Sequence, residues 1–333
     1  MNEMKNCEIE GTICNYSMII HNFIVGLSLK FKRLFRLTTF IEKKEKDNNK
    51  LERSCQGTKV IINVQYGLGN RLRALASAQV LAQKTGREFV LVWIPDVHCQ
   101  AEFHDLFTND FPVINSLDKI DISRADQYNY MDTEAGSEKG KVIDHASGRD
   151  IYVKSAFVLN HKFSKDSEIS MVLQQLDPVQ EIKDIVGQYK VQDRIGLHIR
   201  RGGGKEASKD PWDNAANWSA KGKENLFYWR ERSAPHVFMK EIDRLLAEDR
   251  SLQFFLAADS DDIYDQFQEK YPGKVSFLKR DLYDRSLEQQ KYALADMLLL
   301  SQTKLILGSY WSSFSEIAQR IGGNTMKYSG KDF

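Results

Sequence analysis

Short apolar runs and amphipathic segments alternate along most of the chain, which is typical of parallel α/β sheets. The first series begins with the β-branched run Lys59–Gln65, passes a glycine turn, and continues into Arg71–Lys84, where apolar residues recur at helical spacing. Gly86 ends this segment, and Glu88–Trp93 is a second apolar run. Two strands that flank a helix predict a right-handed parallel crossover.

A second and longer series starts near residue 194. We expect strands at Arg194–Arg200, Leu252–Ala258, Val275–Leu278 and Lys304–Leu307, and helices at Ala234–Asp249, Asp261–Lys270, Glu288–Ser301 and Ser313–Ile321. This repeated alternation predicts an α/β fold in which helices cover both faces of a parallel sheet. Between the two series, the polar, turn-rich stretch from Asn109 to Lys154 predicts no regular element.

The N-terminal part of the chain differs from these two series. Its longest apolar stretch, Met18–Leu29, is interrupted by polar residues and is shorter than the roughly 20 residues that a membrane span needs. The basic stretch Lys30–Arg36 fits either a membrane surface or packing on the body. Glu42–Lys50 is charged and aperiodic, as in a linker. We therefore divide the chain into an N-terminal extension with a charged linker (1–57) and two α/β domains (58–190 and 191–333).

Composition narrows the classes of function. The 333 residues include 47 lysines and arginines and 46 aspartates and glutamates, so bulk charge does not indicate a nucleic-acid partner. Any anion site must therefore be local. The four cysteines, Cys7, Cys14, Cys55 and Cys99, are widely separated, so neither a disulfide framework nor a zinc site is predicted.

Ligands of open α/β sheets bind beyond the carboxyl ends of the strands, and three of these ends carry unusual residues. The first is Gly67-Leu-Gly-Asn70, followed by Arg71 and Arg73, where backbone N–H groups at a helix start favour an anion. A dinucleotide fingerprint would need a third glycine at Leu72. The alternative is a tight turn in which glycine supplies a positive φ.

The second strand end is His198-Ile-Arg-Arg-Gly-Gly-Gly-Lys205. Alternation along the strand places Arg200 on the face of His198 and Arg201 on the opposite face. A guanidinium fork matches phosphate oxygens, and glycines let the backbone approach a ligand, so a diphosphate clamp is predicted here. A solvated basic loop beside a core histidine is the alternative.

The third site combines two strand ends. Ser312, Ser313 and Ser315 place hydroxyls at a helix start, which suits either a phosphate cradle or helix capping. Asp259 and Asp261 could form a carboxylate pair that holds a metal. Alternatively, Asp261 caps the following helix and Asp259 accepts hydrogen bonds from a base or a ribose.

Taken together, four motifs carry a resemblance. In this order, Gly67-Leu-Gly-Asn-Arg-Leu72, His198-Ile-Arg-Arg201, Ala257-Ala-Asp-Ser260 and Ser312-Ser-Phe-Ser315 resemble the motifs of the nodulation-type α-1,6-fucosyltransferases and their protein O-fucosyltransferase relatives. The resemblance covers about residues 58–325. It implies a GT-B fold, with an acceptor-side and a nucleotide-sugar-binding Rossmann-like domain facing across a cleft. It also implies inverting, metal-independent transfer of fucose from GDP-fucose, without a cofactor.

The resemblance also implies roles for single residues. By position, His198 and Arg200, with Arg201 beside them, look like the donor clamp of the family, and Asp259 looks like its guanine-side aspartate. Ser312, Ser313 and Ser315 resemble its phosphate-contacting loop. The residues that fall where the N-terminal loop of the family meets donor and acceptor are Gly67, Gly69, Asn70 and Arg71.

The chain departs from the family after the arginine pair. Many relatives carry an acidic or polar residue there, whereas this chain has Gly202-Gly-Gly204. Glu206, close to where some relatives keep a glutamate, is the candidate base that deprotonates the acceptor hydroxyl, and Asp210 or Asp213 are alternatives. Arg200 should matter more than the base, because the transition state moves negative charge onto the diphosphate.

Three functions therefore compete: a fucosyltransferase that acts on a glycan or glycoconjugate hydroxyl, a metal-dependent transferase of another sugar that uses Asp259 and Asp261, and a non-catalytic nucleotide or glycan binder. The acceptor has no recognisable sequence code. We expect the protein in the cytoplasm or on a membrane surface. The glycosylation sequons Asn15–Ser17 and Asn217–Ser219 leave localisation in a secretory lumen as an alternative.

Overall fold

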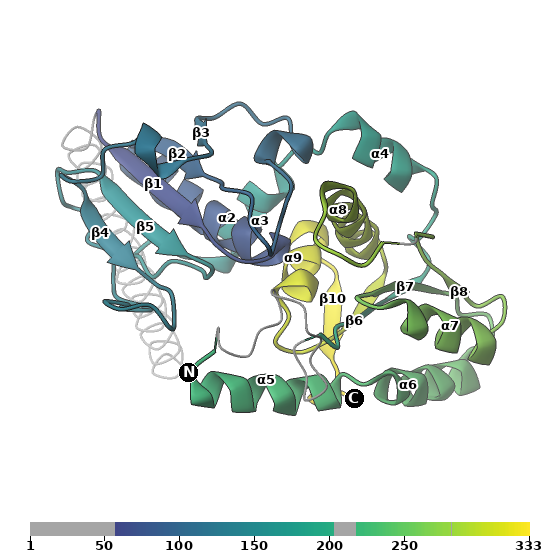
Figure 1. Cartoon of the computed structure of the whole chain (residues 1–333). Helices are drawn as coiled ribbons and strands as arrows, with labels where there is room; N and C mark the ends of the chain where they lie inside the picture. Colours follow the sequence, from purple (N-terminus) through teal and green to yellow (C-terminus); the bar gives the residue numbers. More distant parts are fainter. Residues whose placement is uncertain (1–56, 203–217, 281) are drawn as a thin grey trace, which may run out of the picture. The chain divides into compact units, whose positions relative to one another are not determined.

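The computed structural model describes residues 57–202, 218–280 and 282–333, which contain two parallel five-stranded sheets (Figure 1). In spatial order, the first sheet comprises β3 (Val113–Ile114), β2 (Glu88–Val92), β1 (Lys59–Val64), β5 (Ile151–Ser155) and β4 (Asp126–Asn129). The second comprises β10 (Thr325–Tyr328), β9 (Leu305–Gly308), β6 (Ile195–Ile199), β7 (Phe254–Ala258) and β8 (Val275–Ser276).

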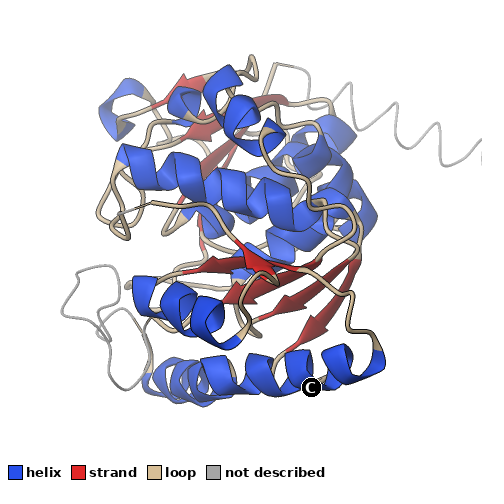
Figure 2. Cartoon of the chain, turned by 90° about the vertical axis from the view of Figure 1, so that its right-hand side faces the viewer, coloured by secondary structure: helices blue, strands red, loops and turns tan. Residues whose placement is uncertain are grey.

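All strand pairs in both sheets are parallel, as the alternating pattern predicts. Every residue of β6 is buried, and so is every residue of β7, because helices cover both faces of the second sheet (Figure 2). Central β6 pairs with β9 on one side and β7 on the other, so that His198 lies beside Gly308 and Ala257. Strand ends from distant parts of the sequence thereby meet at one edge.

Eight α-helices lie in the described part of the chain. They are α2 (Leu68–Thr85), α3 (Asp166–Gln174), α4 (Gln180–Gly187), α5 (Ala220–Arg232), α6 (Pro235–Glu248), α7 (Asp261–Lys270), α8 (Leu287–Ser301) and α9 (Ser313–Gly322). None of the described helices is long and apolar enough to cross a membrane.

Most predicted elements are confirmed within a residue or two, and α7 matches its predicted bounds. Residues 109–154, for which no element was predicted, contain β3, β4 and most of β5. Helix α5 was also not predicted, because Leu226 is its only buried residue and the sequence has no apolar period there. Helix α2 begins at Leu68, so the glycine motif forms its first turn rather than a separate turn before it.

The two halves of residues 55–333 pack directly on each other. Helix α9 of the second half contacts α2 and α3 of the first, and α4 contacts α8 (Figure 1). One apolar core accordingly contains both Leu75 of α2 and Ile317 of α9. The domain boundary between residues 190 and 191 stays a prediction, as does the extension up to residue 57.

Candidate active site

His198, near the carboxyl end of β6, is buried and held by the start of α9. Its Nδ1 lies 2.6 Å from the hydroxyl oxygen of Ser315, and its ring stacks on Phe314 with centroids 4.6 Å apart. Burial lowers the pKa of His198 to about 3. The imidazole is therefore neutral near pH 7, and it serves the site as a hydrogen-bonding group rather than as a cation.

Arg200 follows His198 and is held on two sides. Its backbone N–H donates to the hydroxyl of Ser309 at 2.9 Å, and its guanidinium Nη1 donates to a carboxylate oxygen of Asp259 at 2.7 Å. Both side chains are about four-fifths buried, with exposed fractions of 21% for Arg200 and 16% for Asp259. A guanidinium in this setting is fixed in position before any ligand arrives.

Asp259 also organises the loop after Arg200. Its carboxylate accepts hydrogen bonds from the backbone N–H groups of Arg201 at 3.0 Å and Gly202 at 2.8 Å. Burial alone would raise the pKa of Asp259, but Arg200 and these two N–H groups outweigh it, so the pKa lies below its usual value. The carboxylate of Asp259 is thus ionised and accepts hydrogen bonds from three consecutive residues, Arg200 to Gly202.

Arg201 lies in a different environment from Arg200. Its side chain is 43% exposed, and its nearest acidic partner, Asp262, is 3.9 Å away. This is a weak surface contact. The side chains of the two arginines therefore have separate acidic partners, as strand alternation predicts.

The carboxylate pair considered for a metal is not assembled. Asp259 faces Arg200 and the loop, whereas a carboxylate oxygen of Asp261 accepts a hydrogen bond from the backbone N–H of Asp262 in the first turn of α7. Ser260, rather than Asp261, occupies the cap position of that helix. Over residues 57–202, 218–280 and 282–333, no cluster of three or more histidine, cysteine, aspartate or glutamate side chains could hold a metal ion.

The glycine motif after β1 lies directly against the start of α9. A β-carbon on Gly69 would lie 3.0 Å from the carbonyl carbon of Ser313 and 3.1 Å from the amide nitrogen of Phe314. Only glycine fits here without displacing backbone. Ser312, the cap residue of α9, makes no side-chain capping bond. Gly67, the cap residue of α2, has no side chain that could make one. Two helix amino-terminal turns without side-chain caps are therefore in contact, and both carry positive partial charge.

One alternative for this motif is wrong. Gly67 has an ordinary φ of −70°, and the residue in the left-handed region is Tyr66, with φ 65°. The chain therefore does not use glycine to turn out of β1. A bulky residue held at positive φ costs conformational energy, which is found most often near functional sites.

The arginines of the first helix turn are engaged with protein groups. Arg71 is fully buried and donates to the carbonyls of Tyr66 at 2.7 Å and Ile94 at 2.9 Å, and it pairs with Asp96 at 2.9 Å. The structure thus shows a bracing role for Arg71, and its donor contact stays a prediction. Arg73 bridges the two halves through Glu316 of α9 at 3.4 Å.

The other predicted site residues can also be placed. Asn70 lies in the first turn of α2, beside Gly69. Ser313 faces Gly69, while Ser315 is buried and engaged with His198, so a direct phosphate contact by Ser315 would require it to exchange partners. Glu206, Asp210 and Asp213 lie outside the described residues, and their roles stay predictions.

Sequence reasoning missed two groups of the site. Ser309 bonds to both the N–H of Arg200 and the carbonyl of His198, and its only signal was its position just after a predicted strand. Phe314 was quoted within a serine motif, but its stacking on His198 depends on the order of the strands.

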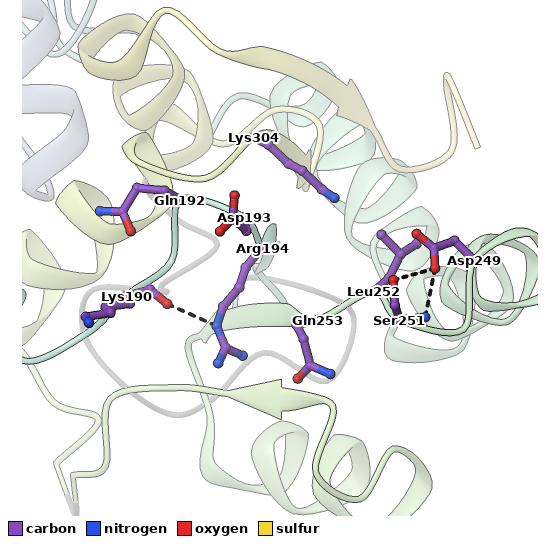
Figure 3. A pocket seen from close by; sticks show the side chains of 9 residues that line it. All are labelled: Lys190, Gln192, Asp193, Arg194, Asp249, Ser251, Leu252, Gln253 and Lys304. Atoms are coloured by element: carbon purple, nitrogen blue, oxygen red, sulfur yellow. Dashed lines mark hydrogen bonds between the residues drawn. The ribbon is translucent and has the colours of Figure 1, made fainter.

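A polar pocket of about 370 Å³ lies at the opposite end of the second sheet (Figure 3). It is lined by residues that precede β6, β7 and β9, among them Arg194, Gln253 and Lys304. No predicted donor residue contributes to it. Parallel sheets bind ligands at the carboxyl edge, so the candidate site remains the His198 and Arg200 edge.

Comparison with known proteins bears on the fold. No protein-family model and no curated protein matches the chain. Among solved structures, the fold is similar to fucosyltransferase NodZ from Bradyrhizobium, with 18% identity, a TM-score of 0.53, and coverage of 79% of this chain and 92% of that chain. NodZ α-1,6-fucosyltransferase co-crystallised with GDP matches with 18% identity, a TM-score of 0.54, and coverage of 79% and 91%. The same enzyme soaked with GDP-fucose matches with 17% identity, a TM-score of 0.52, and coverage of 79% and 92%. These similarities in fold, together with the two parallel five-stranded sheets, confirm the predicted GT-B-like fold.

Proposed function

We propose that this chain is an inverting glycosyltransferase that moves fucose from GDP-fucose to a hydroxyl of a glycan or glycoconjugate. The observation that carries the proposal is the fixed guanidinium of Arg200 at the carboxyl edge of the second sheet, next to neutral His198. The likeness in fold to an enzyme crystallised with GDP and soaked with GDP-fucose supports the choice of donor.

In this proposal, the bond between the anomeric carbon of fucose and the β-phosphate oxygen breaks, and its electron pair goes to the diphosphate. Arg200 stabilises the charge that develops there, because a preorganised guanidinium interacts more strongly with the leaving diphosphate than with the intact donor. The amino-terminal turn of α9 adds N–H groups and a positive partial charge. His198 remains neutral and adds no charge that would compete with Arg200.

The acceptor oxygen attacks the opposite face of the anomeric carbon, which inverts its configuration. Its proton passes to a base, for which Glu206 remains the candidate. Asp259 has two candidate roles. The contacts described above support a positioning role through Arg200, whereas guanine recognition stays a proposal from the family resemblance.

Donor turnover tests the proposal directly. The purified chain is incubated with GDP-fucose, GDP-mannose and UDP-galactose, with and without EDTA, and released nucleoside diphosphate is measured. The proposal expects GDP release from GDP-fucose alone, at the same rate with EDTA. Activity that EDTA removes and manganese restores would favour the metal-dependent transferase. Binding of GDP-fucose without turnover under any condition would favour the non-catalytic binder.

A further inference from the structure

Two tryptophans, the exposed Trp311 and the partly buried Trp218, lie in ring contact and are here called the indole pair. Their ring centroids are 5.7 Å apart and their planes are tilted by 31°. Trp311 is 40% exposed, which makes it one of the exposed large apolar side chains in the described residues. Exposed indole surface is unfavourable in water, so a pair of this kind indicates a binding surface.

The indole pair adjoins the candidate active site. Trp311 lies on the segment between β9 and α9, two residues after Ser309, which binds Arg200, and three before Phe314, which stacks on His198. A ligand that covers Trp311 therefore lies beside the place proposed for the diphosphate sugar.

The residue before Trp311 is firmly packed, whereas Trp311 itself stays exposed. The neighbouring Tyr310 packs on Trp229 of α5, with centroids 4.2 Å apart, and on Tyr328 of β10, with centroids 5.0 Å apart. Trp311 itself has φ 61°, a conformation that costs energy in a bulky residue. Core packing gives no reason for a strained tryptophan that stays exposed, whereas presentation of the indole to a ligand does.

The geometry favours one class of ligand. A planar base held between two rings needs centroids about 7 Å apart, twice the van der Waals contact distance of about 3.5 Å, and the observed 5.7 Å is too close. The pair can therefore offer only an outward-facing surface. The C–H face of a pyranose ring carries partial positive charge and suits the negative face of an indole.

We propose that the indole pair binds a pyranose ring of the acceptor next to the hydroxyl that receives the sugar. This rests on the proposed function for the role of the ligand, but binding of a saccharide to the pair can be tested without it. The hydroxyl of Ser312, the residue after Trp311, does not cap α9. It is therefore the adjacent polar group that can form a hydrogen bond with a hydroxyl at the edge of such a ring.

The test measures saccharide binding and nucleotide binding separately. Calorimetric titrations with cellotetraose, maltotetraose and chitotetraose measure saccharide binding, and separate calorimetric titrations measure GDP affinity. The variants are Trp311→Gly, which removes the indole and also suits the positive φ, and Trp218→Ala. Tyr228→Ala is the matched control, because Tyr228 of α5 is a similarly exposed aromatic residue (45%) whose ring packs on Trp229.

We expect at least one tetrasaccharide to bind the wild type and each tryptophan variant to bind it at least about tenfold more weakly, with Tyr228→Ala unchanged. The loss should fall on the saccharide and not on GDP. Failure of all three saccharides to bind, equal binding by Trp311→Gly, or a matching loss of GDP affinity would overturn the proposal. If wild-type protein binds a tetrasaccharide but no GDP-fucose, the proposed function fails while the indole pair stands.

Discussion

The two glycines of the motif after β1 should respond differently to the same added methyl group. At Gly69, a β-carbon would lie 3.0–3.1 Å from backbone atoms of Ser313 and Phe314, so α2 and α9 would have to move apart. At Gly67, the nearest atom would be the carbonyl oxygen of His98 at 4.0 Å, and φ is an ordinary −70°. Gly67→Ala is therefore a matched control for Gly69→Ala.

The magnitudes follow from the two environments. Overpacking costs about 1–3 kcal/mol, and alanine regains up to about 1 kcal/mol of helix propensity at Gly69, so we expect a net loss of about 1–2 kcal/mol. A loss of this size lowers the melting temperature by about 1–3 °C in a protein of this length. Gly67→Ala should change the stability by less than about 1 kcal/mol, because restriction of the unfolded chain and the poorer N-cap of alanine oppose each other.

The assay is thermal unfolding of the two variants, combined with GDP titration. Gly69→Ala should also weaken GDP binding, because Phe314 connects this contact to His198. Equal melting temperatures for the two variants would refute the packing argument. Loss of GDP affinity in Gly67→Ala alone would show that Gly67, and not the contact between the helices, serves the donor.

Three further predictions concern the polar groups. Arg200→Lys should lower kcat/KM for GDP-fucose about 100-fold or more, and Arg201→Lys by less than about threefold; similar losses would contradict their separate environments. His198, with a folded pKa of about 3 against an ordinary 6.5, remains neutral while the unfolded chain takes up a proton, so stability falls as pH drops through this window. Between pH 7 and pH 5 this amounts to about 2 kcal/mol, which His198→Gln should remove; equal pH dependence in urea unfolding would contradict the shift. Asp259→Asn should raise KM for GDP-fucose, since it releases Arg200 and the following loop, and recovery with manganese would instead favour a metal site.

The fold was largely predictable because its strands are short apolar runs separated by amphipathic helices. Burial of β6 on both faces leaves the stretch from Ile195 to Ile199 apolar except for His198, which the sequence displays directly. Helix α5 was not predictable in this way, because it buries only Leu226 and presents polar residues elsewhere. Strands β4 and β5 lie among turns and were lost in the polar stretch around them.

The sequence predicted which residues belong to the candidate site, but not which of them contact one another. His198, Arg200 and Asp259 were identified as strand-end residues, yet the Arg200 to Asp259 contact depends on β6 and β7 being neighbours, which no local pattern encodes. Position 69 requires glycine because it lies against α9, a helix that starts more than 200 residues later in the chain. The positive φ was assigned to glycine by the usual rule, whereas tertiary structure imposes it on Tyr66.

We propose that the carboxyl edge of the second sheet binds GDP-fucose as the donor. Thermal unfolding in the presence of GDP-fucose, GDP-mannose, UDP-galactose and ADP-glucose, each with EDTA, tests it most directly. A ligand at 100 times its dissociation constant stabilises the folded state by about 2.7 kcal/mol, which corresponds to a rise of about 4–5 °C for a chain of this size. We expect such a rise with GDP-fucose, a smaller one with GDP-mannose, and none with the other two. Equal stabilisation by UDP-galactose, or no stabilisation by GDP-fucose, would contradict it.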